Sequence, residues 1–333
     1  MWELLIGLAL LTIVFLALTV WLLSRLDCDL QLVIYSKFGH SLHDLRGKVC
    51  WITGASSGIG EALAYVLATN GVKLVLSGTN RQRLDEVKSR CQTFGQLDPD
   101  DILVLDFDIT NFDVHNHQLQ EVLVHHKKLD ILVLNAGRTQ RSDFADIDMD
   151  VDKAMFDCNV FGHVSIARVV LRYFIANNIT GAQFVVTSSA AAKLGAPNSA
   201  SYTASKYALH GYFDCLRNEV HSRGIGVTIA CPGPVQSRIQ ENMYTNRLGI
   251  TVNRMADNSS SSDRMETSRC AYLMAIAAVN RLAEVWICDQ PLLSLYYLNQ
   301  YMPALAVRIL PRLMSKKRVD RYREGTTGHH SEK

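Results

Sequence analysis

The fold of this chain is decided by the stretch Val49-Cys50-Trp51-Ile52-Thr53-Gly54-Ala55-Ser56-Ser57-Gly58-Ile59-Gly60. Its first five residues predict a buried strand, and a helix is predicted over 61–69. The glycines between them permit a tight turn, close approach of backbone to a phosphate, and close packing of helix on strand. Free N–H groups at the start of that helix favour a dinucleotide pyrophosphate. An ordinary glycine turn is the alternative, because this motif alone is weak.

Further apolar strands alternate with helices along the chain. Strands are predicted at 72–77, 101–107, 129–134, 183–187, 226–230 and 284–288, and helices at 151–176, 202–221 and 267–280. This alternation indicates a parallel sheet that is covered on both faces. We therefore expect an α/β fold, a Rossmann-type doubly wound parallel sheet in a single domain at 47–290.

The N-terminus predicts a membrane anchor over 1–24. Residues 4–23 carry no charge, and as a helix they span roughly 30 Å, the thickness of a bilayer's hydrocarbon core. A cleaved signal peptide is the alternative, but its apolar run is usually roughly 7–15 residues and follows a basic region that is missing here. The flanking charges leave the orientation of this single-pass N-terminal transmembrane helix open.

The remaining segments flank the domain. Residues 25–46 are predicted to be a connector, and 236–264 a polar mobile loop that covers the substrate. The region 291–333 is predicted to be an apolar segment followed by a basic tail. Pro303, Pro311 and Arg308 interrupt its apolar part, so no second membrane span is expected.

Composition excludes some classes of function. The net charge of +2 argues against a nucleic-acid binder. The eight cysteines are scattered without CxxC spacing, so the sequence predicts no metal site. We expect free structural thiols, with disulfides as the alternative if the domain faces an oxidising lumen.

A phenol and an amine stand four residues apart in Tyr202-Thr203-Ala204-Ser205-Lys206, at the start of a predicted helix. This spacing places both on one face. A neighbouring ammonium lowers the pKa of a tyrosine from its usual value of about 10, which suits proton transfer near neutrality. Ser189 follows the predicted strand 183–187 and could hydrogen-bond a substrate carbonyl. A solvated surface pair is the alternative interpretation of Tyr202 and Lys206.

Together these residues resemble the short-chain dehydrogenase/reductase family over 47–288. The chain resembles its TGxxxGxG element at 53–60, the end of its NNAG element at 135–137, and its PGxVxT element at 232–237. Asn159, Ser189, Tyr202 and Lys206 match its catalytic residues in order and spacing. Leu134 replaces the first Asn of NNAG, which we expect to loosen hydrogen bonding in the central sheet, and Ser237 replaces Thr but keeps the hydroxyl.

The resemblance implies a mechanism in which hydride passes between nicotinamide C4 and the substrate carbon. Tyr202 gives or takes the proton, and Lys206 also binds the nicotinamide ribose. Ser189 polarises the carbonyl, and Asn159 holds a water in the proton relay. The implied cofactor contacts are Thr53, Gly54, Ser56, Ser57, Gly58, Ile59, Gly60, Asp108, Asn135, Ala136, Gly137, Tyr202, Lys206, Pro232, Gly233, Val235 and Ser237.

The end of the second predicted strand bears on the choice of cofactor. An acidic residue there usually binds the ribose hydroxyls of NAD, but residues 76–81 contain none. Arg81 could pair with a 2′-phosphate, so we expect NADP(H), with NAD(H) as the alternative. Arg81 could also be an ordinary charge in the solvated first turn of a helix.

The anchor, the core and the ending 285–303 resemble most closely a membrane-bound subgroup of the family. This resemblance implies the membrane of the endoplasmic reticulum and the reduction of steroids, retinoids and other carbonyls. We hypothesise an enzyme that interconverts a carbonyl and an alcohol on a lipophilic substrate. A membrane-tethered nucleotide- or lipid-binding scaffold is the alternative. Homo-oligomer formation and glycosylation of Asn178 or Asn258 are left open.

Overall fold

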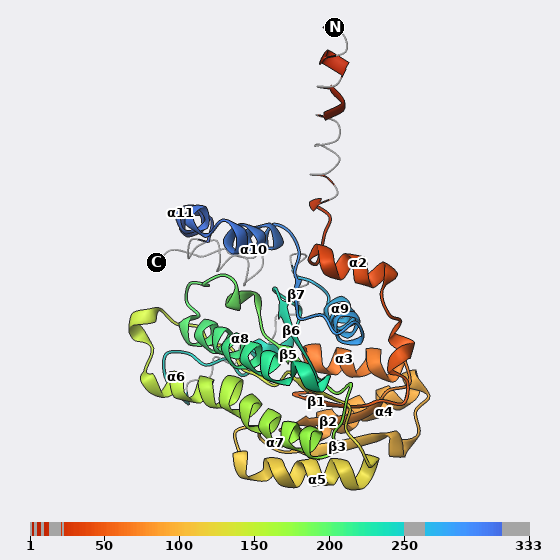
Figure 1. Cartoon of the computed structure of the whole chain (residues 1–333). Coiled ribbons are helices and arrows are strands. Elements are labelled where there is room, and N and C mark those ends of the chain that lie inside the picture. Colours follow the sequence, from red (N-terminus) through yellow and green to blue (C-terminus); the bar gives the residue numbers. More distant parts are fainter. Residues whose placement is uncertain are drawn as a thin grey trace.

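A seven-stranded parallel sheet forms the centre of the protein (Figure 1). The computed structural model describes residues 2, 5–7, 10–12, 21, 23–249 and 264–314. The strands of this part are β1 (Val49–Thr53), β2 (Lys73–Gly78), β3 (Ile102–Asp106), β4 (Ile131–Leu134), β5 (Gln183–Thr187), β6 (Gly226–Pro232) and β7 (Glu284–Ile287). Their order is β3-β2-β1-β4-β5-β6-β7. The first three strands are added toward one edge of the sheet and the last four toward the other, so the strand order reverses between β1 and β4. This topology confirms the predicted Rossmann-type sheet in a single domain.

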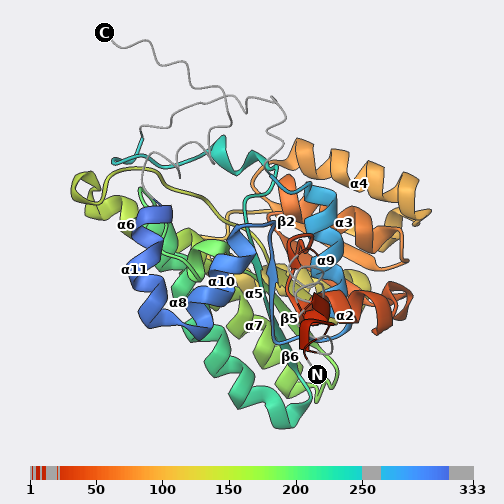
Figure 2. The ribbon, with the colours of Figure 1, turned by 90° about the horizontal axis from the view of Figure 1, so that it is seen from above.

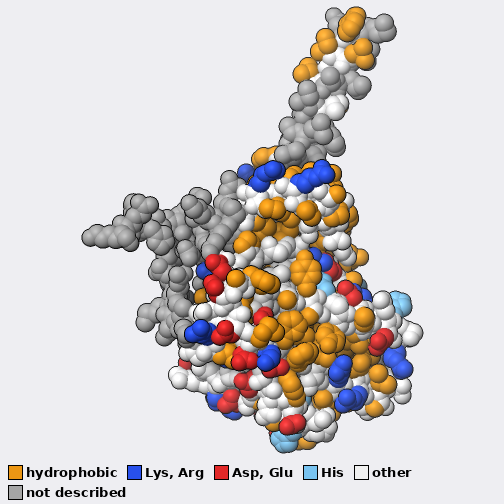
Figure 3. All heavy atoms as spheres, turned by 90° about the vertical axis from the view of Figure 1, so that its left-hand side faces the viewer, with side chains coloured by type: hydrophobic (Ala, Val, Ile, Leu, Met, Phe, Trp, Pro, Cys, Tyr) orange, Lys and Arg blue, Asp and Glu red, His pale blue; other side chains and the backbone are white. Residues whose placement is uncertain are grey.

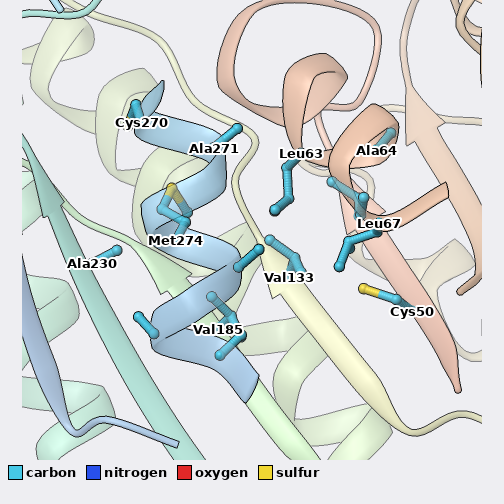
Figure 4. Close-up of a cluster of buried hydrophobic side chains, with 14 of the residues drawn as sticks. Cys50, Leu63, Ala64, Leu67, Val133, Val185, Ala230, Cys270, Ala271 and Met274 are labelled. Atoms are coloured by element: carbon cyan, nitrogen blue, oxygen red, sulfur yellow. The ribbon is translucent and has the colours of Figure 1, made fainter. Parts of the chain in front are cut away.

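Helices cover both faces of the sheet, and apolar side chains fill the two layers between. They are α2 (Leu30–Phe38), α3 (Gly58–Ala68), α4 (Arg81–Gly95), α5 (His115–His126), α6 (Met149–Phe156), α7 (Gly162–Ala176), α8 (Ala200–Val220), α9 (Thr267–Val279), α10 (Leu292–Tyr301) and α11 (Pro303–Leu313). One core layer lies under α3, α4 and α9, and the other under α5, α7 and α8. Figure 4 shows Leu63 and Leu67 of α3 and Met274 of α9 close to Val133 and Val185 on the central strands.

The central strands are buried along their whole length because both of their faces are covered, and most of their residues are apolar. Every residue of β1, β4 and β5 is buried, which is the pattern of a parallel sheet between two helical layers. The predicted bounds of β1 and β5 agree with the structure, and those of the other strands differ by one or two residues at an end.

Two helical predictions differ from the structure. The predicted helix 151–176 is divided into α6, a π-helical turn at Asp157–Phe161, and α7. The connector predicted at 25–46 contains α2 and a 3₁₀ turn, Leu42–Leu45. α2 is stabilised by Asp29, which accepts a hydrogen bond from the Leu32 N–H at 2.9 Å, and by packing against α9. Neither contact is visible in a local hydrophobic pattern.

The predicted anchor lies mostly outside the described residues. Its described apolar members are exposed, including Trp2, Leu5, Leu11 and Trp21. The first described pieces of this stretch, near the N-terminus, lie away from the domain in Figure 1. Within the part of the chain that the structure describes, one helical stretch, Met149–Ala176, is long and apolar enough to cross a membrane. Its most apolar window is 61% buried, so it is a core helix of the domain.

All eight cysteines are free thiols, and seven are buried. Burial raises the pKa of the Cys28, Cys91 and Cys270 thiols to about 12. These thiols are therefore protonated near neutrality, as expected for small buried apolar side chains.

Candidate active site

A cavity of about 720 Å³ opens at the carboxyl ends of the strands. It lies where the strand order reverses between β1 and β4, the place where open parallel sheets bind ligands. Most predicted site residues line it. The exceptions are Gly60, Arg81 and Asn159. Of these, Gly60 and Asn159 contact residues that line the cavity.

The glycine turn between β1 and α3 packs closely against residues 135–136 and has backbone angles that favour glycine. Gly54 and Gly58 have φ angles of +65° and +61°, which L-residues with side chains rarely adopt. A Cβ at Gly54 would lie 2.7 Å from Ala136 Cα, and one at Gly60 would lie 2.6 Å from Asn135 Nδ2. Ser57 makes no side-chain capping bond to the start of α3. The first N–H groups of α3 therefore suit an anionic ligand such as a pyrophosphate.

Thr53 and Asn135 join the ends of β1 and β4. Thr53 Oγ1 accepts from the Asn135 N–H at 2.9 Å and the Ala136 N–H at 3.2 Å. Asn135 Nδ2 donates to the carbonyl oxygens of Thr53 and Gly54, each at 3.2 Å. Leu134 is buried and pairs in register with Val186 of β5. The pairing of β4 with β5 therefore includes Leu134, whereas its pairing with β1 ends at Val133.

Asn159 lies in the π-helical turn and is fully buried. Its Oδ1 accepts from the Arg138 N–H at 2.8 Å, and its Nδ2 donates to Arg138 O at 2.9 Å and Ser205 Oγ at 3.1 Å. Ser205 Oγ in turn donates to Tyr202 O at 2.7 Å. The extra residue of a π-turn is often found at functional sites. Here the turn brings Asn159 against the first turn of α8.

Lys206 is buried beside Tyr202, one turn along α8. Its Nζ donates to Thr187 O at 2.9 Å and lies 5.8 Å from the centroid of the Tyr202 ring. Burial lowers the pKa of the Lys206 ammonium to about 8. A lysine that is 3% exposed does not fit the alternative of a solvated surface pair.

Gly137 leaves room between Asn159 and Lys206. The Cβ position of Gly137 lies 3.2 Å from Asn159 Oδ1 and 3.7 Å from Lys206 Nζ. Nearby, burial and then the Lys206 charge lower the pKa of His163 to about 3. His163 is therefore neutral near neutrality, and the positive charge at this point belongs to Lys206.

Ser189 caps a 3₁₀ turn at the end of β5, where its Oγ accepts from the Ala191 N–H at 3.1 Å. Its neighbour Ser188 begins a partly buried polar network that the sequence analysis missed. Ser188 Oγ lies 3.0 Å from His210 Nε2, and His210 Nδ1 lies 3.3 Å from Glu284 Oε2. The sequence carried one signal for this network, because His210 follows Lys206 by four residues on one face of α8.

Glu284 joins this network to the loop after β5 through Lys193, whose Nζ is 2.7 Å from Glu284 Oε1. Burial alone would raise the pKa of the Glu284 carboxyl, but hydrogen bonds from His210 and Lys193 and the Lys193 charge lower the pKa to about 2. The network ties β5, α8 and β7 together directly behind Ser189 and Lys206.

Two predicted cofactor contacts, Asp108 and Arg81, differ in their position relative to the cavity. Asp108 lines the cavity, and its Oδ1 accepts from Thr110 N and Oγ1, each at 2.9 Å. Arg81 instead lies on the exposed start of α4, with its Nε 2.9 Å from Asp85 Oδ2. This position agrees with the alternative of an ordinary helix charge.

The C-terminal segment forms an apolar wall of the same cavity. Leu292, Leu295 and Tyr296 of α10, with Leu313 and Met314 at the end of α11, line it. Tyr296 is 1% exposed, so it belongs both to the hydrophobic core and to the lining of the cavity. Burial raises the pKa of the Tyr296 hydroxyl well above its usual value, so this group is neutral.

Comparison with known proteins places the chain among short chain dehydrogenases. The family model of that description matches residues 48–248. Dehydrogenase/reductase SDR family member 7 of Homo sapiens is 41% identical over 327 residues, covering 97% of this chain and 95% of that protein. The 11-beta-hydroxysteroid dehydrogenase 1A of Arabidopsis thaliana is 36% identical over 216 residues, covering 65% of this chain and 59% of that protein.

Two solved structures share the fold. A short chain dehydrogenase/reductase from Burkholderia phymatum, in complex with NAD, is 24% identical with a TM-score of 0.68, covering 78% of this chain and 95% of its own. A short chain dehydrogenase from Burkholderia cenocepacia, in complex with NADP, is 22% identical with a TM-score of 0.61, covering 74% of this chain and 98% of its own. Both support the assignment of the fold.

The Glu284 network predicts a stability that depends on pH. The pKa of Glu284 is lowered from 4.5 to about 2 in the folded protein. Its contribution to the free energy of unfolding is therefore fully present above the pKa of the unfolded chain and is lost as the pH falls through about 2. Glu284→Gln should lower the free energy of unfolding by about 1–3 kcal/mol at neutral pH and by less near about pH 3. Urea unfolding of the detergent-solubilised protein measures both. Glu219→Gln, at an exposed position of α8, is the control, and an equal loss at both pH values contradicts the network.

Proposed function

The chain belongs to the short-chain dehydrogenase family, and we propose that it is an NAD(P)(H)-dependent oxidoreductase acting on a carbonyl or alcohol of a lipophilic substrate. The observation that carries this proposal is the buried Lys206 ammonium beside Tyr202, at the carboxyl ends of the strands and next to the glycine turn. A scaffold that only binds nucleotide or lipid has no physical need for a charged amine in this position, because burying it costs stability.

The glycine turn supports binding of a nicotinamide dinucleotide. Side chains at Gly54 or Gly60 would collide with the end of β4, and the uncapped start of α3 offers N–H groups to phosphates. The residues that would hold the cofactor are the lining residues of the turn, of 135–137 and of 232–237, together with Asp108. When bound, the cofactor supplies or accepts the hydride.

The protein's own part is proton transfer and orientation. In the reductive direction Tyr202 gives its phenolic proton to the developing alkoxide, and the Lys206 charge stabilises the phenolate that remains. Ser189 donates a hydrogen bond to the substrate oxygen, which fixes the carbonyl for attack. The space that Gly137 leaves between Asn159 Oδ1 and Lys206 Nζ suits a water that returns the proton.

The substrate class follows from the wall of the cavity. α10 and α11 line one side with leucines and a neutral tyrosine, which favours an extended apolar molecule with few polar groups. The name of one relative, a hydroxysteroid dehydrogenase, supports steroid-type carbonyls. Retinoid and xenobiotic carbonyls share the same chemistry.

We propose residues 1–24 as an uncleaved membrane anchor, with the endoplasmic reticulum as the location implied by the family resemblance. The exposed apolar side chains at its described positions support this reading, because soluble proteins rarely leave such residues together in water.

Tyr202→Phe should keep cofactor binding and lower turnover by at least ~100-fold, because it removes only the acidic hydroxyl. The assay is NADPH or NADH oxidation by detergent-solubilised protein with a panel of steroid, retinoid and quinone carbonyls. Full activity of the variant contradicts the mechanism, and cofactor binding by the wild type without turnover of any substrate favours the scaffold.

The proposed preference for NADP(H) over NAD(H) rests on Arg81. If this side chain leaves Asp85 for a 2′-phosphate, Arg81→Ala should raise the KM for NADPH about tenfold, or about 1.4 kcal/mol, and leave that for NADH unchanged. Asp85→Ala, which frees Arg81 from its ion pair, should not weaken NADPH binding. Equal effects of Arg81→Ala on both cofactors mean that Arg81 does not read the phosphate.

Deleting residues 1–24 should convert a carbonate-resistant membrane protein into one that carbonate or high salt releases, because the uncharged run alone matches the hydrocarbon thickness. Fractionation of membranes from expressing cells measures this. Release of the full-length protein indicates a cleaved signal, and resistance of the truncated protein indicates deep insertion of the C-terminal region.

A further inference from the structure

The segment that leads from the N-terminal stretch into the domain is bonded to the edge of the sheet. The Asp29 N–H donates to Trp286 O at 2.9 Å, and the Trp286 N–H donates to Asp29 Oδ2 at 2.5 Å. Cys28 pairs with Ile287 in an isolated antiparallel bridge. Residues 28–29 therefore extend the sheet beyond β7.

Side chains from α9 and α10 hold the same segment. Arg269 of α9 makes a two-pronged ion pair with Asp27, with its Nε at 2.7 Å and its Nη2 at 3.1 Å from the carboxylate oxygens. Tyr297 OH of α10 accepts from the Leu30 N–H at 3.0 Å. We call residues 27–30 with these partners the clamp. It fixes residues 27–30, which follow the N-terminal stretch, to the edge of the domain.

Apolar side chains are exposed on the helices next to the clamp. Leu30, Ile34 and Phe38 follow each other at four-residue spacing on α2 and are 47%, 56% and 83% exposed. Tyr301 and Val307 of the α10–α11 pair are 72% and 71% exposed. Figures 1 and 2 agree that α2, α10 and α11 lie on the side of the domain from which the N-terminal stretch departs.

Positive charge accompanies these apolar side chains. Arg308 and Arg312 lie on α11, Lys37 on α2, and Arg25 directly follows the N-terminal stretch. Figure 3 shows Lys and Arg side chains above hydrophobic ones on this end of the domain, just below the N-terminal stretch. Apolar residues rimmed by arginine and lysine are typical of helices that lie in the head-group region of a bilayer.

We propose that α2 and the α10–α11 pair form a membrane-docking face that binds anionic phospholipid. The clamp holds this face next to the point where the proposed anchor joins the domain. The proposal rests on the anchor proposed above, because the anchor brings this face to the bilayer. The cavity wall of Leu292, Leu295, Leu313 and Met314 belongs to the same two C-terminal helices. Docking therefore sets the apolar side of the cavity next to the bilayer, from which a lipophilic substrate enters.

Tryptophan quenching by lipid tests the docking face in the full-length protein. Val307→Trp and Val124→Trp are matched, because Val307 on α11 and Val124 on α5 are 71% and 68% exposed and α5 lies at the end of the domain opposite the anchor (Figure 1). Each variant is reconstituted into phosphatidylcholine–phosphatidylserine vesicles whose acyl chains carry bromine. The added emission of Val307→Trp should be quenched, and that of Val124→Trp should not. Equal quenching of the two overturns the docking face.

The same experiment separates the two proposals. Trp2 and Trp21 lie in the proposed anchor, so quenching of the wild-type emission reports on the anchor. If the wild type is quenched but the added tryptophan at position 307 is not, the docking face is overturned and the anchor stands. Val307→Glu should then raise the KM for a vesicle-borne steroid ketone at least severalfold and leave the KM for a water-soluble carbonyl unchanged. Val124→Glu should change neither, and an unchanged KM for the vesicle-borne ketone in Val307→Glu overturns the entry route.

Discussion

The buried Lys206 ammonium is the constraint on which the site depends. A charge away from water requires polar partners in fixed places, and here Thr187 O at the end of β5 accepts from it at 2.9 Å. Its position beside Tyr202 requires the start of α8 to pack against the sheet, and the π-turn around Asn159 fastens that start through Ser205. Gly137 keeps the space between Lys206 and Asn159 open. Four segments far apart in the sequence thus meet around one amine.

The edge strand β7 links this site to the N-terminal segment. Glu284 at its start contacts His210, which follows Lys206 by one turn of α8. Trp286, two residues further on, exchanges backbone and side-chain hydrogen bonds with Asp29 of the clamp. The strand therefore supports the helix that carries Tyr202 from one side and holds the exit of the N-terminal stretch from the other. The proposed docking face and the proposed reaction centre are therefore both connected to β7.

The sequence predicted those features whose signal is local. The run 49–60 predicts a strand, a glycine turn and a helix, and the structure has all three. The spacing of Tyr202 and Lys206 predicts a shared helix face, and both line the cavity. Long-range contacts had no such signal: α2 packs against α9, and the Ser188–His210–Glu284 network joins residues up to 96 positions apart. The place of Arg81 after the second strand predicted a contact with a 2′-phosphate. In the structure its side chain instead pairs with Asp85, one turn further along α4.

The pH dependence of kcat/KM for the nicotinamide cofactor tests the central claim most directly, because this ratio reports the free enzyme. The pKa of Lys206 is lowered by burial to about 8, so the charge is present below that pH and is lost above it. The wild-type ratio should be level near neutrality and fall as the pH rises through about 8, while Lys206→Met should give a low ratio without that fall. A wild-type ratio that stays level to about pH 10, or a Lys206→Met variant with the wild-type ratio, contradicts the role of the buried charge.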